Sequence, residues 1–118
     1  MIYRVSGTGG DVAIGLFNSP NTKVLNNTIK INGNYPNAVE YRFVNTSGVE
    51  IRNNLTDAAI TGREGGSGTI VNNLTNVASS LFVNVGSGNL HLVSGASAAI
   101  DKATAHPDVT NDFDGETR

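Results

Sequence analysis

Apolar and polar residues alternate along short segments of the first 95 residues. In residues 39–43, apolar side chains occupy every second position, and Glu40 and Arg42 stand between them. Residues 29–31 and 49–51 follow the same rule. A period of two places successive side chains on opposite faces of a β-strand, so these segments are predicted to be strands with one apolar face. No sustained helical period interrupts them, which indicates an all-β protein.

The strand-like segments recur at fixed distances along the chain. Residues 22–27 align with residues 49–54 at an offset of 27, and the same offset sets residues 12–18 above residues 39–45. A third copy in residues 69–75 follows at an offset of 19. Similar units joined by spacers of unequal length are typical of a solenoid, in which each unit contacts its neighbours. We therefore expect stacked coils of strand joined by loops of different length.

Each copy carries two asparagines at the same place. The three pairs are Asn26 and Asn27, Asn53 and Asn54, and Asn72 and Asn73. Asparagine adopts the left-handed backbone region more readily than other non-glycine residues, which suits a sharp bend between strands. Amides stacked at the roughly 4.8 Å spacing of neighbouring strands can also hydrogen-bond to one another. The pairs are therefore predicted to be structural turn residues.

The apolar faces of the predicted strands supply the expected core. It consists of Val12, Ile14, Leu16, Val24, Ile29, Ile31, Val39, Tyr41, Phe43, Val49, Ile51, Ile70, Leu81, Val83, Leu90, Leu92 and Ile100. We expect one domain, with coils over residues 1–94 and a tail over residues 95–118 that caps the C-terminal end, starting with a helical turn at 97–102. The N-terminal end, beginning at Ile2, has no comparable cap, so its exposed strand edges are expected to be either an association hazard or an interface.

The tail carries a more specific pattern. Residues 90–101 (Leu-His-Leu-Val-Ser-Gly-Ala-Ser-Ala-Ala-Ile-Asp) precede residues 112–118 (Asp-Phe-Asp-Gly-Glu-Thr-Arg). Together with the coil-like residues 18–29, these segments resemble the closing part of right-handed parallel β-helix proteins of the pectate-lyase-like superfamily. Two positions depart from that pattern, because Ser79-Ser80 stands where Asp-Pro is usual and Ala98 replaces a proline. The resemblance implies a short right-handed parallel β-helix of about four to five coils, in a family that is typically extracellular or on the cell surface.

Composition narrows the classes of function. Charged residues make up 15% of the chain, against about 25% in typical soluble domains, and the net charge is −2 with no basic cluster. Nucleic-acid binding therefore has little support. The absence of cysteine excludes disulfides and thiolate zinc sites. Because no segment approaches the ~18 apolar residues of a membrane span and none resembles a signal peptide, we expect a soluble chain without a membrane partner.

Candidate catalytic chemistry is sparse. Enzymes of the resembled superfamily need an acidic calcium cluster with a base, or a pair of carboxylates. Glu40 and Glu50 are expected to point outward into solvent, one from each coil, which does not pair them. His91 is expected to be exposed on a strand, and His106 lies in the tail without a second histidine at metal-ligand spacing. We predict no catalytic residue and no metal site.

The tail acids form the densest charged group. Asp101, Asp112 and Asp114 are predicted to cap backbone amides of the tail and to pair with Arg118. The alternative is a calcium ion held by Asp112 and Asp114, because hard cations bind several carboxylate oxygens. These residues lack the spacing of a twelve-residue calcium loop, so we favour the structural role and expect no cofactor.

Three functions remain open from the sequence. The first is a non-catalytic structural or glycan-binding module, in which Glu40, Tyr41, Arg42 and Arg52 contact an extended polysaccharide by stacking and hydrogen bonding. The second is the C-terminal remnant of a polysaccharide lyase or glycoside hydrolase whose catalytic coils are absent. The third is an assembly element that forms a homodimer by end-to-end stacking of its N-terminal coils. We expect the first function, combined with the self-association of the third.

Overall fold

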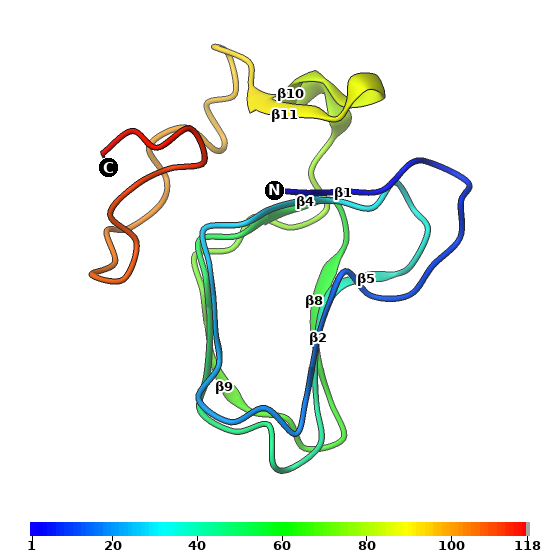
Figure 1. Cartoon of the computed structure of the whole chain (residues 1–118), viewed down its shortest axis with the longest axis vertical. Helices are drawn as coiled ribbons and strands as arrows, with labels where there is room; N and C mark the ends of the chain where they lie inside the picture. The colour runs from blue at the N-terminus through cyan, green and yellow to red at the C-terminus, as the bar shows by residue number, and fades with distance from the viewer. Residues whose placement is uncertain (118) are drawn as a thin grey trace.

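A computed structural model describes residues 1–117 and shows three parallel β-sheets of three strands each. The sheets have the strand orders β1-β4-β7, β2-β5-β8 and β3-β6-β9. The chain contributes one strand to each sheet and then returns to the first, so that strands of the same sheet lie one above another (Figure 1). We call β1 to β3 the first level of this stack, β4 to β6 the second and β7 to β9 the third.

The strands are short. The first level contains β1 (Ile2–Tyr3), β2 (Ile14–Phe17) and β3 (Lys23–Leu25); the second contains β4 (Thr28–Lys30), β5 (Asn37–Arg42) and β6 (Val49–Arg52). The third level contains β7 (Leu55–Thr56), β8 (Ala59–Arg63) and β9 (Gly68–Val71). Two 3-10 turns follow, η1 (Ser79–Leu81) and η2 (Val85–Ser87), together with β10 (Phe82–Asn84) and β11 (Asn89–Leu92).

The all-β prediction is confirmed, and residues 1–117 form three levels where the sequence suggested four or five. Within the same residues, no helix has the length and apolar character needed to cross a bilayer.

The register of the sheets confirms most of the repeat. Ile29 lies opposite Ile2, and Ile51 lies opposite Val24, both at the expected offset of 27. Ile70 lies opposite Ile51 at the expected offset of 19. These residues form columns along the stack, because equivalent positions in successive levels point in the same direction.

The offset predicted for β2 and β5 is wrong by two residues. Leu16 pairs with Tyr41 and Ile14 with Val39, an offset of 25. The connection before β2 is two residues longer than the one before β5, and the connection after β2 is two residues shorter, so the total period stays at 27. A shift of two keeps every side chain on its face of the strand, so alternation alone cannot detect it.

The main core lies between the three sheets. Its buried members are Leu16, Val24, Ile29, Ile31, Ala38, Val39, Val49, Ile51 and Ala58. Two residues that the sequence placed in the core are instead exposed. Phe43, 37% exposed, follows the end of β5 with φ of 72°, and Val83, 55% exposed, points away from the protein on β10.

The chain leaves the parallel arrangement after the third level. Strands β10 and β11 form an antiparallel pair, with Phe82 opposite Leu92, although the sequence suggested further stacked coils through residue 94. Phe82 and Leu90 are buried in a second apolar cluster that also contains Tyr3 of β1 and Leu55 of β7. The hairpin therefore covers the outer side of the β1-β4-β7 sheet (Figure 1).

Residues 95–117 form the tail, which contains no strand or helix. One hydrogen-bonded turn opens it, in which the amide of Ile100 donates to the carbonyl of Ala96 (3.0 Å). The sequence predicted that the tail covers the C-terminal end of the stack. Its hydrogen bonds and ion pairs to the stack lie instead along the outer side of the β3-β6-β9 sheet, from Lys23 in the first level to Asn72 beyond the third.

Candidate functional site

Two outer sheet faces gather polar and aromatic side chains, and the first belongs to the β2-β5-β8 sheet. Alternation turns Phe17, Arg42 and Arg63 away from the core, and the register places them side by side in successive levels. Tyr41 points to the opposite side, where it packs against the core. Its ring covers Gly62, where an added Cβ would lie 2.6 Å from a ring carbon. Tyr41, expected both in the core and at a ligand, therefore belongs to the core.

Phe17, Arg42, Phe43 and Glu64 form what we call the aromatic–arginine cluster. The guanidinium carbon of Arg42 lies 5.6 Å from the ring centroid of Phe17 and 5.1 Å from that of Phe43. The two rings contact edge to face, with centroids 6.1 Å apart. Both remain exposed, Phe17 by 45% and Phe43 by 37%. The cluster thus presents apolar rings and a cation on the same surface, an arrangement in which the ring faces attract the guanidinium.

Glu64 fixes the orientation of Arg42. Two hydrogen bonds join them, from Nη2 to Oε1 (2.7 Å) and from Nε to Oε2 (3.2 Å). These hydrogen bonds, together with the positive charge of Arg42, hold the pKa of Glu64 below its ordinary value. The guanidinium is therefore held in one plane.

Glu40 is buried, and the prediction that it faces solvent is wrong. Only 1% of the residue is exposed, because the turn that precedes β5 folds over it. Its carboxylate accepts hydrogen bonds from Asn37 Nδ2 (2.7 Å), Arg63 Nη1 (3.2 Å) and Tyr35 Oη (3.3 Å). Burial alone would raise the pKa of Glu40, but these hydrogen bonds and the charge of Arg63 outweigh it and lower the pKa. Glu40 thus connects β5 to its neighbours.

The inner asparagines form a ladder along the stack, as the sequence predicted. Asn54 Oδ1 accepts from the backbone amide (3.0 Å) and side-chain amide (3.1 Å) of Asn27. Asn73 Oδ1 accepts from the same two groups of Asn54, both at 2.9 Å. The Nδ2 of Asn54 also donates to the carbonyl of Val24 (2.9 Å). Each amide therefore ties one level to the next.

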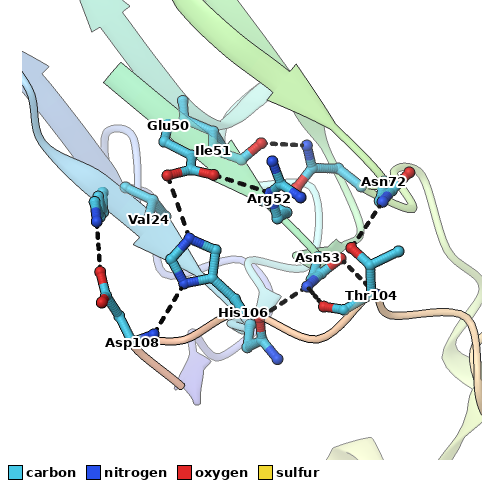
Figure 2. Close-up of polar contacts among 12 residues, drawn as sticks. Val24, Glu50, Ile51, Arg52, Asn53, Asn72, Thr104, His106 and Asp108 are labelled. Carbon is cyan, nitrogen blue, oxygen red and sulfur yellow. Dashed lines mark hydrogen bonds and ion pairs between the residues drawn. The ribbon is translucent and has the colours of Figure 1, made fainter. Parts of the chain in front are cut away.

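The outer asparagines have a different role. Asn26, Asn53 and Asn72 adopt the predicted left-handed backbone, with φ between 53° and 56°. The side chains of Asn53 and Asn72 hold Thr104 of the tail (Figure 2), while Asn26 Oδ1 accepts from Asn53 Nδ2 (3.1 Å). Asn53 Nδ2 donates to the carbonyl of Thr104 (2.8 Å), and its Oδ1 accepts from the Thr104 amide (3.2 Å). Asn72 Nδ2 donates to Thr104 Oγ1 (3.0 Å).

Two further contacts join the tail to the β3-β6-β9 sheet (Figure 2). Asp108 forms an ion pair with Lys23 in the first level, and this contact lowers the pKa of Asp108. His106, whose side chain is 9% exposed, lies over Glu50 in the second level with Nε2 3.4 Å from Oε2. Because His106 Nδ1 accepts from the Asp108 amide (3.2 Å), its proton is on Nε2 and points at Glu50.

Arg52 lies on this second face, where its Nε is 3.0 Å from Glu50 Oε1. The four residues predicted to contact a glycan are therefore not brought together. Arg42 lies on the first face, Glu40 is covered beside it, Tyr41 points inward, and Arg52 belongs to another sheet.

The tail acids cap backbone amides in part as predicted. Asp112 Oδ1 accepts from the amides of Asp114 (3.0 Å) and Glu116 (2.8 Å), which confirms its capping role. Asp114 contacts Nε2 of the exposed His91 (3.1 Å), and Asp101 is exposed in a left-handed turn. The predicted partner Arg118 lies outside the described residues. Across residues 1–117, no three His, Cys, Asp or Glu side chains are grouped so that they could hold a metal.

The structure adds residues that sequence reasoning missed. Phe17 lies beside Arg42 only with the offset of 25, so the assumed offset of 27 concealed this neighbour. Tyr35 and Arg63 reach Glu40 from a turn and from another strand, and no local pattern marks them. Thr104 and His106 carry no recognisable motif. No family model, curated protein or solved structure matches the chain.

Proposed function

We propose that the chain is a non-catalytic module of the right-handed parallel β-helix type, whose β2-β5-β8 face binds an extended carbohydrate. The observation that supports this most strongly is the aromatic–arginine cluster, in which two exposed rings flank one oriented guanidinium. Aromatic rings offer an apolar surface on which the C–H face of a sugar can stack, and an arginine donates several hydrogen bonds to hydroxyls.

The shape of the face favours a chain over a single sugar. Phe17 belongs to the first level, Arg42 to the second and Arg63 to the third. Because neighbouring strands lie about 4.8 Å apart, the three side chains span roughly 10 Å along the stack. Arg63, whose side chain is 41% exposed, adds a second donor at the far end. Successive sugar units can therefore meet successive levels.

The face is organised before binding. The ion pair with Glu64 and the contacts with both rings hold Arg42 in place, so little side-chain freedom remains to be lost. Preorganisation of this kind lowers the entropic cost of association.

Binding without catalysis follows from the state of the carboxylates. Glu40, at the centre of this face, is covered and held ionised by Arg63, so it cannot protonate a glycosidic oxygen. Glu64 is engaged with Arg42 through both oxygens. A glycosidase needs one protonated and one free carboxyl group on either side of the scissile bond.

The test is a calorimetric titration with a panel of neutral and acidic polysaccharides. Phe17→Ala and Phe43→Ala are each expected to weaken binding by at least about tenfold, because each ring supplies stacking area beside Arg42. Val83→Ala removes an exposed apolar side chain of the hairpin, away from this face, and is expected to bind as the wild type does. Wild-type protein that binds no polysaccharide of the panel, or equal losses in all three variants, would contradict the proposal.

A further inference from the structure

Lys23, Glu50, Asn53 and Asn72 form what we call the tail-contact face, on the outer side of the β3-β6-β9 sheet. It contacts the tail at every second residue. Thr104 bonds to Asn53 and Asn72, His106 lies over Glu50, and Asp108 pairs with Lys23 (Figure 2). The tail thus crosses the face from the third level toward the first, and its polar groups match the face in hydrogen bonding and charge.

The tail contributes nothing to either apolar cluster. The buried members of both clusters, and the half-buried residues packed against them, lie at or before Leu92. Ala96 is buried, but every residue from 97 to 117 is exposed or half-buried. The side chains of Lys23 and Asp108 are 48% and 51% exposed. His106 is largely covered, but the exposed ion pair contributes little to stability and no tail residue joins an apolar cluster, so we expect that the tail can separate while the stack remains folded.

The tail bends just before these contacts, and an open space lies beside it. Residues 101–103 are exposed, and Asp101 has φ of 58°, which marks a bend just before Thr104. A cavity of about 850 Å³ is lined mainly by the tail itself, and Asn26 and Leu92 are its lining residues outside the tail. The segment after the bend is therefore attached through the backbone and hydroxyl of Thr104 and the side chains of His106 and Asp108, without a contribution to either apolar cluster.

We propose that the tail-contact face is an interaction surface for the tail of a second copy of this chain, and that two copies exchange residues 104–117. Every contact made within one chain is remade between two chains, which is the condition that makes exchange of an identical element a low-cost route to a dimer. The closed monomer has the advantage of high effective concentration, so the exchanged dimer gains population as protein concentration rises.

The exchange concerns a different sheet from the proposed carbohydrate face. It would place two carbohydrate faces in one particle. This consequence rests on the proposed function, but the exchange itself does not.

A charge swap on the full-length chain tests this directly. The Lys23→Asp variant has an acidic group on the face, which repels every tail that carries Asp108. The Asp108→Lys variant has a basic group on the tail, which is repelled by every face that carries Lys23. Each variant alone is expected to stay monomeric by size-exclusion chromatography with light scattering. In an equimolar mixture, the altered face of one variant matches the altered tail of the other, and the two unaltered groups also match. The mixture is therefore expected to form a heterodimer whose dissociation constant is at least tenfold lower than that of either variant alone. The double variant restores the match within one chain and is expected to behave as the wild type does.

The controls separate exchange from other associations. Glu116→Lys reverses a tail charge that makes no contact with the face, so its mixture with Lys23→Asp is expected to stay monomeric. The far-ultraviolet circular dichroism of each variant shows whether the stack is folded. A charge-swap mixture that remains monomeric while all variants are folded would overturn the proposal. Dimers of either single variant alone would overturn it as well, because they would place the interface elsewhere, for instance at the ends of the stack.

Discussion

The stack and the tail are held together by opposite kinds of interaction. In the stack, apolar columns fill the space between three sheets, and buried polar groups such as Asn54 and Asp57 find partners in a neighbouring level. In the tail, Thr104, His106 and Asp108 each meet the stack through separate polar contacts, and of these only the His106 side chain is largely covered. Removing a group from the stack therefore leaves a buried partner unsatisfied, whereas removing one from the tail exposes its partner to water.

This difference assigns the two regions different tasks. A stack whose levels are tied together by side-chain ladders offers a rigid face, which suits the carbohydrate binding that we propose for the aromatic–arginine cluster. A tail that joins neither apolar cluster suits the exchange that we propose, in which it leaves and rebinds without unfolding the stack. The predictions below act on matched residues in the two regions, from the largest expected effect to the smallest.

The largest effect is expected from the buried ion pair of Lys30 and Asp57. Their side chains are 7% and 5% exposed, and Asp57 also accepts from the amides of Ile31 and Asn32, both at 2.8 Å. Asp57→Ala leaves a buried cation and two amides without an acceptor, so a loss of about 3–5 kcal/mol in the free energy of unfolding is expected by urea denaturation. Asp108→Ala removes a carboxylate from the exposed ion pair of the tail and is expected to leave the urea midpoint unchanged. Equal midpoints for the two variants would contradict the comparison.

The asparagine pairs offer a second test within one dipeptide. Asn54 is 2% exposed and bonds to both neighbouring levels, so Asn54→Ala is expected to cost about 2–3 kcal/mol of stability. Asn53 bonds outward to Asn26 and Thr104, and Asn53→Gly keeps the left-handed backbone accessible. We expect the second variant to lose less than about 1 kcal/mol in thermal or urea denaturation. A larger loss for Asn53→Gly than for Asn54→Ala would reverse the roles assigned to the two asparagines.

The pH dependence of stability is expected to come from the stack. The folded-state pKa values of Glu40 and Asp57 lie below their ordinary values of 4.5 and 3.8, so both carboxylates stabilise the fold above those values. This stabilisation is lost as the pH falls through the lowered pKa values, because the unfolded chain then binds more protons than the folded one. Urea midpoints are expected to be flat from pH 7 to about 5 and to fall steeply below about pH 4. In Asp57→Asn the fall should be shallower, and an unchanged slope would show that Asp57 does not contribute.

The parts of the fold that could be predicted are those in which the same residue type recurs in each level. Ile29 and Ile51 stand in columns that the 27-residue offset aligned correctly, and the paired asparagines appeared at the bends where they were expected. The β2–β5 register escaped prediction because a two-residue shift preserves alternation. The hairpin of β10 and β11 escaped because its apolar residues also alternate, and alternation does not distinguish parallel from antiparallel pairing.

The candidate site was less accessible from the sequence than the fold. Arg42 was singled out correctly as a residue of an exposed sheet face, but its neighbours Phe17 and Glu64 come from other levels. Glu40 has the alternation of a solvent-facing residue, and it is covered only because the turn that contains Tyr35 folds back over the strand. Contacts of this kind depend on the path of the loops between strands, and the alternation of apolar and polar residues carries no information about that path.

Native-state hydrogen exchange measured amide by amide tests the central claim most directly, namely that the tail is attached independently of a stable stack. We expect the amides of β4, β5 and β6 to exchange only through global unfolding, with free energies that fall together as urea is added. The amides of Ile100 and Val109, which are hydrogen-bonded within the tail, are expected to exchange through a local opening that is nearly independent of urea. Tail amides with the same exchange free energy and urea dependence as those of β5 would contradict the account, because tail and stack would then unfold as one cooperative unit.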